Sequence, residues 1–555
     1  MQQLETSFTP PEVAPKKGDQ EKVKIRFYVF FDGTLNNRTN IEQRLLAAPD
    51  QKLTAEEREE AKKLKERMAA QKAQEDNLLS KPPTTMEELD QVNAIVAERA
   101  LGKPEELYKE HGAKKDKKTG EAIGDNSYEG YYTNVVKMER QVIVDDGETP
   151  EYDLALKVYI EGSGSMDKLG DETAGFALAM SESGVPAKVE KGMRKAITNI
   201  AMKNPDRSII IEKLTLDVFG FSRGAASART FINDAMSGRK TLLAGKALSG
   251  NDESTTVKAQ LEGKGFTVNE VKVCFAGLFD TVSSYGLGMV TDQLDITHDA
   301  ANNVKALSLD AVALAEEVLH LAAADEHRFN FSLTSIRSAG SNGCEIFLPG
   351  AHADIGGGYR DAVTERQILR GNPGLGGVIL HGNYPSIEEA EKDIERLVAA
   401  GWYRKGEFTV TPILDDNDNV KWVKVEVIRQ GQSPEAGIRN SYSRIPLNIM
   451  VKKAREKQIV FRDKFDRDEP FPDEVGNTVK SEIEKYVAEH GGKGKYTSDW
   501  SHWNNLPDPV LSKNTEPREW LRKLRHDFCH FSAQMNPGHD PRFDKGLRKR
   551  MIHNG

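Results

Sequence analysis

The chain has 555 residues, of which 38% are hydrophobic and 29% charged, and its formal net charge is −9 at pH 7. This length predicts two or three lobes with a sizeable core, and the negative charge disfavours general nucleic-acid binding. The three cysteines, Cys274, Cys344 and Cys529, lie too far apart for a disulfide framework or a metal site of the usual spacing. The first residues lack the pattern of a secretory signal and no apolar run is long enough to span a bilayer, so we expect a soluble chain made in the cytoplasm.

The first part of the chain predicts an arm, a strand and an insertion. Residues 1–22 are polar and include three prolines, which is typical of a flexible arm. Residues 23–31 alternate and are rich in branched and aromatic side chains, so they predict the first strand. Residues 41–125 are dense in Lys, Glu, Ala and Gln, and Thr54 is the expected N-cap of a helix there. We interpret residues 41–125 as a charged helical insertion outside the sheet.

Strands and helices alternate from residue 154 to about residue 360. The expected strands cover residues 154–160, 213–219, 271–279 and 345–348, and the expected helices cover 170–203, with a break near 184–186, and 307–325. This alternation predicts an α/β catalytic domain over residues 23–360, with a mostly parallel sheet and helices on both faces. Residues 361–555 lose the alternation and hold all five tryptophans and a basic end, so we expect an α-rich accessory lobe there.

The most informative motif is Gly220-Phe221-Ser222-Arg223-Gly224. It reads Gly-x-Ser-x-Gly between a predicted strand and a run of small residues that suits a closely packed helix. That context is the one a nucleophile elbow requires, because glycines permit the sharp turn and leave the serine hydroxyl exposed at the sheet edge. The alternative is a tight strand-to-helix turn with a surface serine.

A serine nucleophile needs a base, usually a histidine that a carboxylate orients. In α/β-hydrolases the chain order is serine, acid, histidine, and this chain offers Ser222, Asp280 and His352 in that order. Each follows a predicted strand, where open α/β sheets place their active sites. Taken singly, Asp280 is also a candidate turn cap and His352 a candidate structural histidine. Asp354 is the rival acid, but its position two residues after His352 favours a role in shaping the loop.

Two backbone N–H groups are needed to bind the oxyanion, and we assign them to Arg223, directly after the serine, and to Gly33 in the loop after the first strand. Asp32-Gly33-Thr34 also occurs in haloacid-dehalogenase-type phosphatases, but their nucleophilic aspartate is replaced here by Phe30. The glycines at 356–358 lack the spacing of a phosphate-binding loop, and the chain has no His-Glu-x-x-His run. The sequence therefore predicts a catalytic site without cofactor or metal.

Four motifs resemble those of the DUF2235 proteins, which include the Tle1 family of type VI secretion lipase effectors. They are Phe-Asp-Gly-Thr-Leu-Asn at 31–36, Gly-Phe-Ser-Arg-Gly at 220–224, Phe-Asp-Thr-Val at 279–282 and Pro-Gly-Ala-His-Ala-Asp-Ile-Gly-Gly-Gly-Tyr at 349–359. The resemblance implies an α/β-hydrolase fold and phospholipase A activity. It carries the nucleophile, acid and base onto Ser222, Asp280 and His352.

The resemblance also implies partners and a destination. It implies a membrane phospholipid as substrate, a VgrG-type spike protein that delivers the chain into the periplasm of a rival bacterium, and a cognate immunity protein. The basic residues at 518–525 and 548–550, with the tryptophans, suit contact with anionic lipid headgroups, although core tryptophans and a solvated basic helix fit the pattern equally. A soluble carboxylesterase with the same triad and an inactive scaffold protein are the alternative functions.

Overall fold

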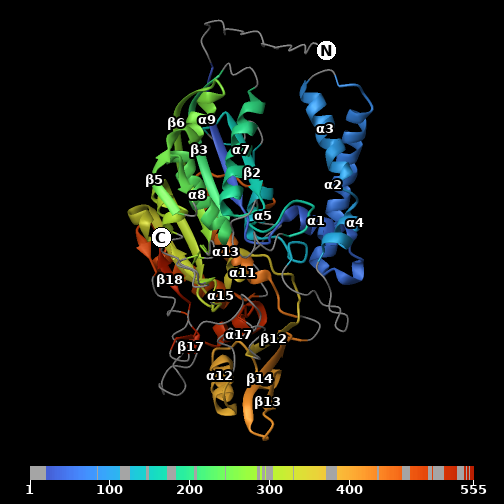
Figure 1. The fold of residues 1–555 in the computed structure, drawn as a ribbon, viewed down its shortest axis with the longest axis vertical. Coiled ribbons are helices and arrows are strands. Elements are labelled where there is room, and N and C mark those ends of the chain that lie inside the picture. The colour runs from blue at the N-terminus through green and yellow to red at the C-terminus, as the bar shows by residue number, and fades with distance from the viewer. Residues whose placement is uncertain are drawn as a thin grey trace.

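The computed structural model of the protein centres on a seven-stranded sheet with the order β15-β11-β9-β6-β3-β1-β2 (Figure 1). Each neighbouring pair of these strands is parallel. The strands are β1 (Lys22–Phe31), β2 (Leu154–Ile160), β3 (Ile210–Phe221), β6 (Thr267–Phe279), β9 (Ala315–Ala323), β11 (Gly343–Leu348) and β15 (Lys495–Tyr496). The structure describes residues 21–555 apart from 84–85, 113–125, 145–148, 150, 172–182, 205–208, 244–245, 284–287, 290–293, 296–303, 329, 371–383, 434–436, 466–474, 498–502, 504–517, 534–542, 545–546 and 549.

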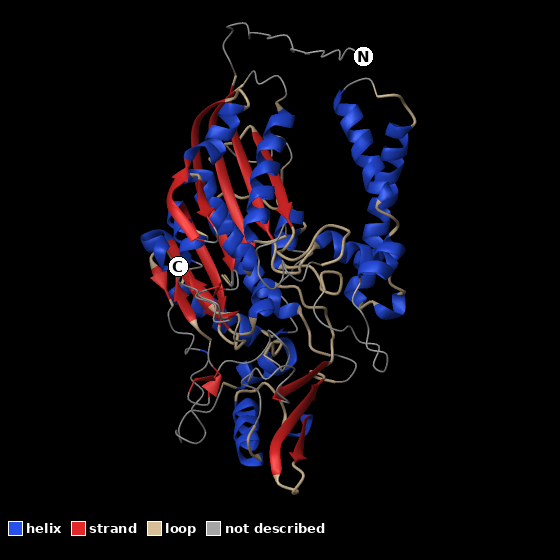
Figure 2. Ribbon diagram, in the orientation of Figure 1, coloured by secondary structure: helices blue, strands red, loops and turns tan. Residues whose placement is uncertain are grey.

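Both faces of the sheet are covered by helices, because the side chains of its central strands alternate between two apolar layers. On β1, Phe27 and Val29 pack with α7 (Val185–Lys203), α8 (Arg223–Ser237) and α9 (Val257–Gly263). On the opposite face, Tyr28 and Phe30 belong to the layer that contains α5 (Asn134–Gln141) and α13 (Arg444–Glu456). Figure 2 shows this layering of helices against strands. The predicted α/β class with a mostly parallel sheet is confirmed.

The five predicted strands of the catalytic part lie within β1, β2, β3, β6 and β11 and are confirmed. The predicted helix over 307–325 is wrong. The structure places a short 3-10 turn at Leu309–Leu314 and then β9, which lies between β6 and β11. Since β9 is a central strand covered on both faces, its apolar run lacks the alternation that separates a strand from a buried helix. The helix predicted over 170–203 is seen as α7, which begins at the predicted break, and residues 172–182 lie outside the described part.

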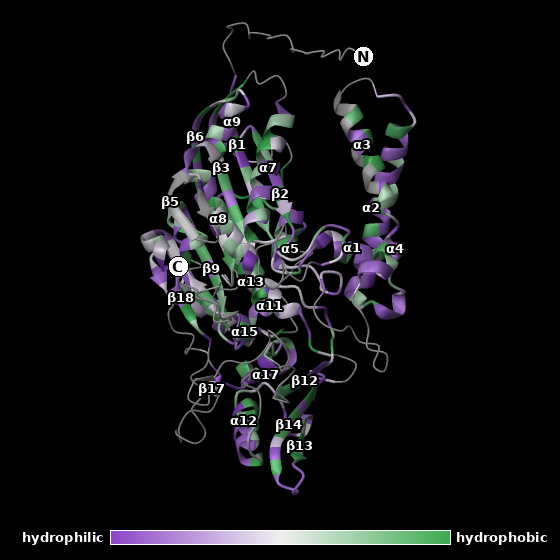
Figure 3. Ribbon diagram, in the orientation of Figure 1, coloured by the Kyte–Doolittle hydropathy of each residue, from purple (hydrophilic) through white to green (hydrophobic). Residues whose placement is uncertain are grey.

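The insertion is helical and stands beside the sheet (Figure 1). Its helices are α1 (Arg38–Ala47), α2 (Ala55–Leu79), α3 (Met86–Ala100) and α4 (Pro104–His111). Thr54 caps α2 as predicted, since its hydroxyl accepts from Glu57 N while the Glu57 carboxylate accepts from Thr54 N. Along α2, only Glu57, Ala61 and Leu64 are buried, and α2 and α4 carry many hydrophilic residues (Figure 3). Buried Glu57 pairs with Arg44 and with Arg360, and so ties the insertion to the loop after α11 (His352–Gly356).

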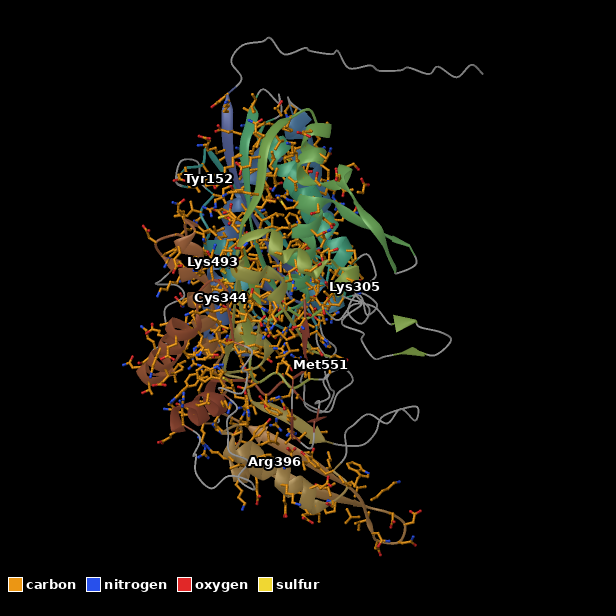
Figure 4. All side chains as sticks on the ribbon, turned by 90° about the vertical axis from the view of Figure 1, so that its left-hand side faces the viewer. Tyr152, Lys305, Cys344, Arg396, Lys493 and Met551 are labelled. Carbon is orange, nitrogen blue, oxygen red and sulfur yellow. The ribbon has the colours of Figure 1, made fainter. Side chains whose placement is uncertain are left out.

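Residues 361–555 do not form a lobe of their own. One part, α12 (Ile387–Ala399) with an antiparallel sheet of β12 (Glu365–Arg370), β14 (Val420–Arg429) and β13 (Phe408–Leu414), projects from the body (Figures 1 and 4). The other elements return to the catalytic part: β15 is an edge strand of the main sheet, α13 packs against β6 and β9, and β18 (Ile552–Asn554) pairs with β10 (Leu333–Ser335). Strand pairing and helix packing therefore cross the boundary expected at residue 360. No local sequence pattern encodes these contacts.

The described strands and α-helices not yet named lie outside the main sheet. They are β4 (Arg239–Leu243), β5 (Lys246–Asp252), β7 (Gly288–Met289), β8 (Leu294–Asp295), α15 (Asn477–His490), α17 (Glu519–Phe528), β16 (Phe543–Asp544) and β17 (Leu547–Arg548). Within the described residues, none of the helices combines the length and the apolar character needed to cross a bilayer.

Candidate active site

Ser222 occupies the sharp turn between β3 and α8. Its backbone has φ +59° and ψ −129°, a conformation that L-residues rarely adopt and that active-site turns often hold under strain. Ser222 N donates to Phe279 O at 3.0 Å, and Val282 N donates to Ser222 O at 3.3 Å. These two bonds attach the turn to the end of β6 and to the segment directly after it, which begins with Asp280.

The two motif glycines are required by close backbone packing. A Cβ at Gly220 would lie 2.5 Å from Gly224 O, and a Cβ at Gly224 would lie 2.2 Å from Asp32 O. Neither neighbour is a flexible side chain, so a larger residue at either position would displace the backbone. The Gly-x-Ser-x-Gly pattern therefore reflects how tightly the turn packs against the end of β1.

Asp280 and His352 form a buried pair. Asp280 follows β6, His352 begins α11 directly after the loop that ends β11, and His352 Nδ1 lies 2.5 Å from Asp280 Oδ2. Asp280 is fully buried, with a positive φ of +44°, and its Oδ1 also accepts from Ala323 N at 2.8 Å. Since an ionised carboxylate only accepts hydrogen bonds, Nδ1 carries the proton and Nε2 is left as the basic nitrogen.

Aromatic rings hold the His352 imidazole. The Phe221 ring lies 4.6 Å from it and the Phe331 ring, edge-on, 5.0 Å from it, measured between centroids. Burial lowers the pKa of His352 below its ordinary value, although Asp280 opposes this shift. The neutral imidazole that a general base requires is therefore favoured near neutral pH.

Ser222 and His352 line the same cavity, whose volume is about 490 Å³. The structure thus brings Ser222, Asp280 and His352 to one site, at the carboxyl ends of three parallel strands. Within the part of the chain that the structure describes, no hydrogen bond joins the Ser222 hydroxyl to His352. Contacts between a nucleophile and its base are often long until substrate binds.

Arg550 is a site residue that the sequence analysis assigned elsewhere. Its Nη1 lies 2.5 Å from Asp280 Oδ1 and its Nη2 lies 2.8 Å from Asp280 Oδ2, and the Arg550 side chain is almost fully buried. Its other donors bind Phe331 O and Ala323 O, each at 3.0 Å. No sequence motif marks this contact, because Arg550 lies in a basic run that is equally typical of a solvated surface.

The two predicted oxyanion donors differ in their surroundings. Arg223 is the first residue of α8, where backbone N–H groups point out of the helix end, and it lines the cavity. Gly33 N donates instead to Asp32 Oδ1 at 2.8 Å, and a Cβ at Gly33 would lie 2.5 Å from the Phe221 ring. The geometry therefore disagrees with Gly33 as a donor, whereas Thr34, the next residue, lines the cavity.

Asp32 organises the loop after β1. Its carboxylate accepts hydrogen bonds from Tyr159 OH and Thr133 Oγ1, each at 2.7 Å, as well as from Gly33 N. Burial raises the pKa of Asp32 to about 6. All three of these donors belong to loops or strands around the site, so Asp32 acts as a structural anchor. Among the described residues, no cluster of His, Cys, Asp and Glu side chains has the arrangement of metal ligands.

Asp354, the rival acid, contacts a different histidine. Its Oδ1 lies 2.9 Å from His530 Nδ1, and its Oδ2 accepts from Ala351 N at 2.8 Å. Asp280, and not Asp354, is the carboxylate bonded to His352.

The tryptophans and basic residues of the last third that suit contact with lipid headgroups differ in exposure: Arg518 and Lys523 are exposed, whereas others lie in the core. Trp402 and Trp503 are each only 2% exposed. Arg525 pairs with Asp325 in the interior, and Arg548, like Arg550, has a buried ion-pair partner. The two tryptophans belong to the core. The buried arginines can lie there because each is paired with a carboxylate. Trp500 and Lys549 lie outside the described residues.

Comparison with known proteins agrees with this architecture. Residues 244–370, which include Asp280 and His352, match the family model described as "T6SS, Phospholipase effector Tle1-like, catalytic domain". A solved structure entitled "Structure of the Tle1 effector bound to the VgrG spike from the Type 6 secretion system" aligns over 99% of this chain and 98% of that one, with 18% identity and a TM-score of 0.50. The likeness indicates a shared fold.

A crystal structure of an uncharacterized protein from Pseudomonas aeruginosa aligns over 87% of this chain and 52% of that one. Its 14% identity and TM-score of 0.34 are too low to indicate a common fold. No curated protein sequence matches the chain significantly. The family match agrees with the resemblance inferred from the four motifs, since residues 244–370 are similar to the Tle1-like catalytic domain of type VI secretion phospholipase effectors.

Proposed function

We propose that the protein is a serine hydrolase that cleaves acyl esters of glycerophospholipids, with phospholipase A activity. The observation that carries this proposal is the buried Asp280–His352 pair, whose histidine lines the same cavity as Ser222 on its strained turn. An imidazole oriented in this way, next to a serine on an elbow, is the arrangement that acyl transfer requires.

Each member of the triad has its own role in the reaction. His352 Nε2 takes the proton of the Ser222 hydroxyl as Oγ attacks the acyl carbonyl, and Asp280 stabilises the imidazolium that forms. His352 then gives this proton to the leaving glycerol oxygen, so that an acyl-enzyme and a lysophospholipid result. Water, deprotonated by His352, attacks the acyl-enzyme, and His352 returns the proton to Ser222 Oγ as the fatty acid is released. The backbone N–H groups of Arg223 and Thr34 are our candidates for binding the oxyanion.

Ser222→Ala tests the proposal. The variant is expected to fold like the wild type and to lose several orders of magnitude of phospholipid hydrolysis, as enzymes of this kind do when a triad member is removed. A fluorophosphonate probe should label the wild type and not the variant. Near-wild-type hydrolysis by Ser222→Ala would exclude the mechanism, and an unlabelled, inactive wild type would favour the scaffold alternative.

The soluble carboxylesterase is the second candidate, because the triad alone does not distinguish the two substrates. Hydrolysis of a short-chain phospholipid below and above its micelle concentration separates them. A phospholipase that works at membranes should accelerate once aggregates form, whereas a soluble esterase should follow the monomer concentration alone.

We also propose delivery by a VgrG-type spike, with an immunity protein as the protective partner. The support is the family match and the common fold with an effector solved on its spike. Mixing the purified chain with a VgrG-type spike protein, followed by size-exclusion chromatography, tests the first partner. Failure to form a complex would contradict that part of the proposal.

A further inference from the structure

Arg550, the cation that pairs with Asp280, is anchored by the chain that follows it. Leu333 N donates to Met551 O at 2.8 Å, and β18 then pairs in parallel with β10. Arg550 Nε also donates to Phe331 O, two positions before the first residue of β10. The C-terminal side of Arg550 is therefore attached to the segment whose carbonyl its own guanidinium binds.

Arg548 anchors the chain on the other side of Arg550. Its Nη1 lies 2.5 Å from Asp393 Oδ1, and the two side chains are only 6% and 9% exposed. Asp393 lies on α12, and it also accepts a hydrogen bond from Tyr384 OH. Helix α12 and the sheet of β12, β14 and β13 form the part that projects from the body, which we call the projecting module (Figure 1). The Arg548–Asp393 pair therefore connects this module to the segment that reaches Asp280.

The two buried ion pairs are joined by a very short length of chain. Arg548 and Arg550 are two positions apart, and two residues of chain span about 7 Å at most. We call Arg548 and residues 550–554 the strap. The strap is held at both ends, on Asp393 and on β10, and Arg550 lies between these anchors. Releasing the Asp393 end would give Arg550 freedom to move.

The position of Arg550 matters because its contact with Asp280 consists of two directed bonds. Nη1 and Nη2 each meet one carboxylate oxygen, at 2.5 and 2.8 Å. A two-fold contact of this kind is geometrically specific. A shift of about 1 Å in a catalytic group can lower turnover by about 100-fold, even when the mutation that causes it is distant. A loosened strap should therefore disturb the carboxylate that orients His352.

We propose that Arg548 and Asp393 are positioning residues of the triad, which hold Arg550 in place on Asp280. This inference rests on the proposed function, and it adds the projecting module to the parts of the chain on which activity depends. Neither Arg548 nor Asp393 is among the described residues that line the cavity. The Arg548 guanidinium does lie 5.5 Å from the ring centroid of Phe531, which lines it. The experiment must therefore distinguish an effect through Arg550 from one through Phe531.

A double-mutant cycle on two soluble substrates makes this distinction. Asp393→Asn should lower kcat by about five- to tenfold, less than the loss expected for removal of Arg550 itself, with KM unchanged. The loss should be equal on dibutanoyl phosphatidylcholine and on the neutral ester dibutanoyl glycerol, because Asp280 serves both reactions. In an Arg550→Met background the same substitution should cause no further loss, whereas independent effects would add. Additive losses would overturn the role of the strap.

Two further variants control for stability and for changes on α12. Arg548→Lys keeps the buried charge but loses the planar fork, so it should fold and show a smaller loss of the same kind. Glu388→Gln breaks an exposed pair with Lys392 on the same helix and should resemble the wild type. Urea unfolding measures the stability of each variant. A loss of activity that merely follows the unfolded fraction would contradict a positioning role.

The pKa of His352, measured by NMR, tests the inference without any hydrolysis. The charged groups around the pair that this imidazole forms are Asp280, Arg550, Glu326 and Arg328. Asp393→Asn should displace only the cation of Arg550, so the pKa of His352 should rise, as in Arg550→Met. An unchanged pKa in both Asp393→Asn and Arg548→Lys would overturn the inference. A wild type that hydrolyses neither ester, and whose variants still show these shifts, would contradict the proposed function alone.

Discussion

The guanidinium of Arg550 donates hydrogen bonds to both carboxylate oxygens of Asp280, although the two residues are 270 positions apart along the chain. The carboxylate that orients His352 therefore lies between a fixed cation and the imidazole. Burial alone would raise the pKa of Asp280, but the charge of Arg550 and the hydrogen bond of His352 outweigh it and hold that pKa well below its usual range. Asp280 is consequently ionised near neutral pH.

Arg550→Met should leave a buried carboxylate without its cation and lower kcat/KM by about 10- to 100-fold, the range expected for hydrogen bonds to a charged group. The loss should be equal on vesicles and on a soluble ester, because Arg550 acts through Asp280 and not through lipid. Removing this positive charge should also raise the pKa of His352 and move the acid limb of kcat/KM to higher pH.

Two further variants distinguish a positioning role of Arg550 from an effect on protein folding. Arg550→Lys should restore part of the activity, and Lys523→Met, at an exposed position of α17, should resemble the wild type. If Arg550→Met merely reduces the fraction of active protein, the pH profile will keep its wild-type shape, and the positioning role is then wrong.

The pH profile of the wild type follows from His352. Burial places its folded pKa below the ordinary value of 6.5, so the neutral base persists as pH falls through that value and is lost only below the folded pKa. The acid limb of kcat/KM should therefore lie below pH 6.5. An unfolded chain binds the proton more readily, so His352 should also destabilise the fold progressively below pH 6.5. A limb above that pH would contradict the buried, neutral imidazole.

The two carboxylates should separate in function. Asp280→Asn should reduce turnover of the phospholipid and the neutral ester alike, by about four orders of magnitude, because the histidine would lose its correct tautomer. Asp354→Asn should reduce turnover far less, because the Asp354 carboxylate bonds His530 and not His352. Steady-state kinetics on both substrates checks this, and a larger loss of neutral-ester turnover in Asp354→Asn would reverse the assignment of the acid.

Gly224→Ala should destabilise the elbow. The new Cβ would meet Asp32 O at 2.2 Å, and overpacking against backbone typically costs about 1–3 kcal/mol. Gly263→Ala, at the end of α9, is the matched control, since a Cβ there has nothing within 4 Å and should be neutral or slightly stabilising. Urea unfolding measures both variants, and equal stability for the two would show that the turn can relax.

Local patterns predicted the framework of this protein. The strands that end at Phe221, Phe279 and Leu348 have the burial and branching of sheet interiors, and they are followed by Ser222, Asp280 and His352 in that order. The elbow could be recognised from the sequence because its glycines are required by close contacts. These contacts are made with residues only a few positions away or with the end of a neighbouring strand. The choice of Ser222, Asp280 and His352 could be made from order and spacing because parallel strands bring their carboxyl ends to one edge.

Only the tertiary structure decided the contacts between distant segments. A buried apolar run such as β9 has no period that marks it as a strand, so its neighbours in the sheet determine it. Arg550 has the same sequence appearance as a solvated arginine, and its role depends on the buried Asp280 that it meets. Asp354 and His530 became a pair in the same way. Composition and periodicity report local geometry, whereas the partner of a buried charge is set by packing across the whole chain.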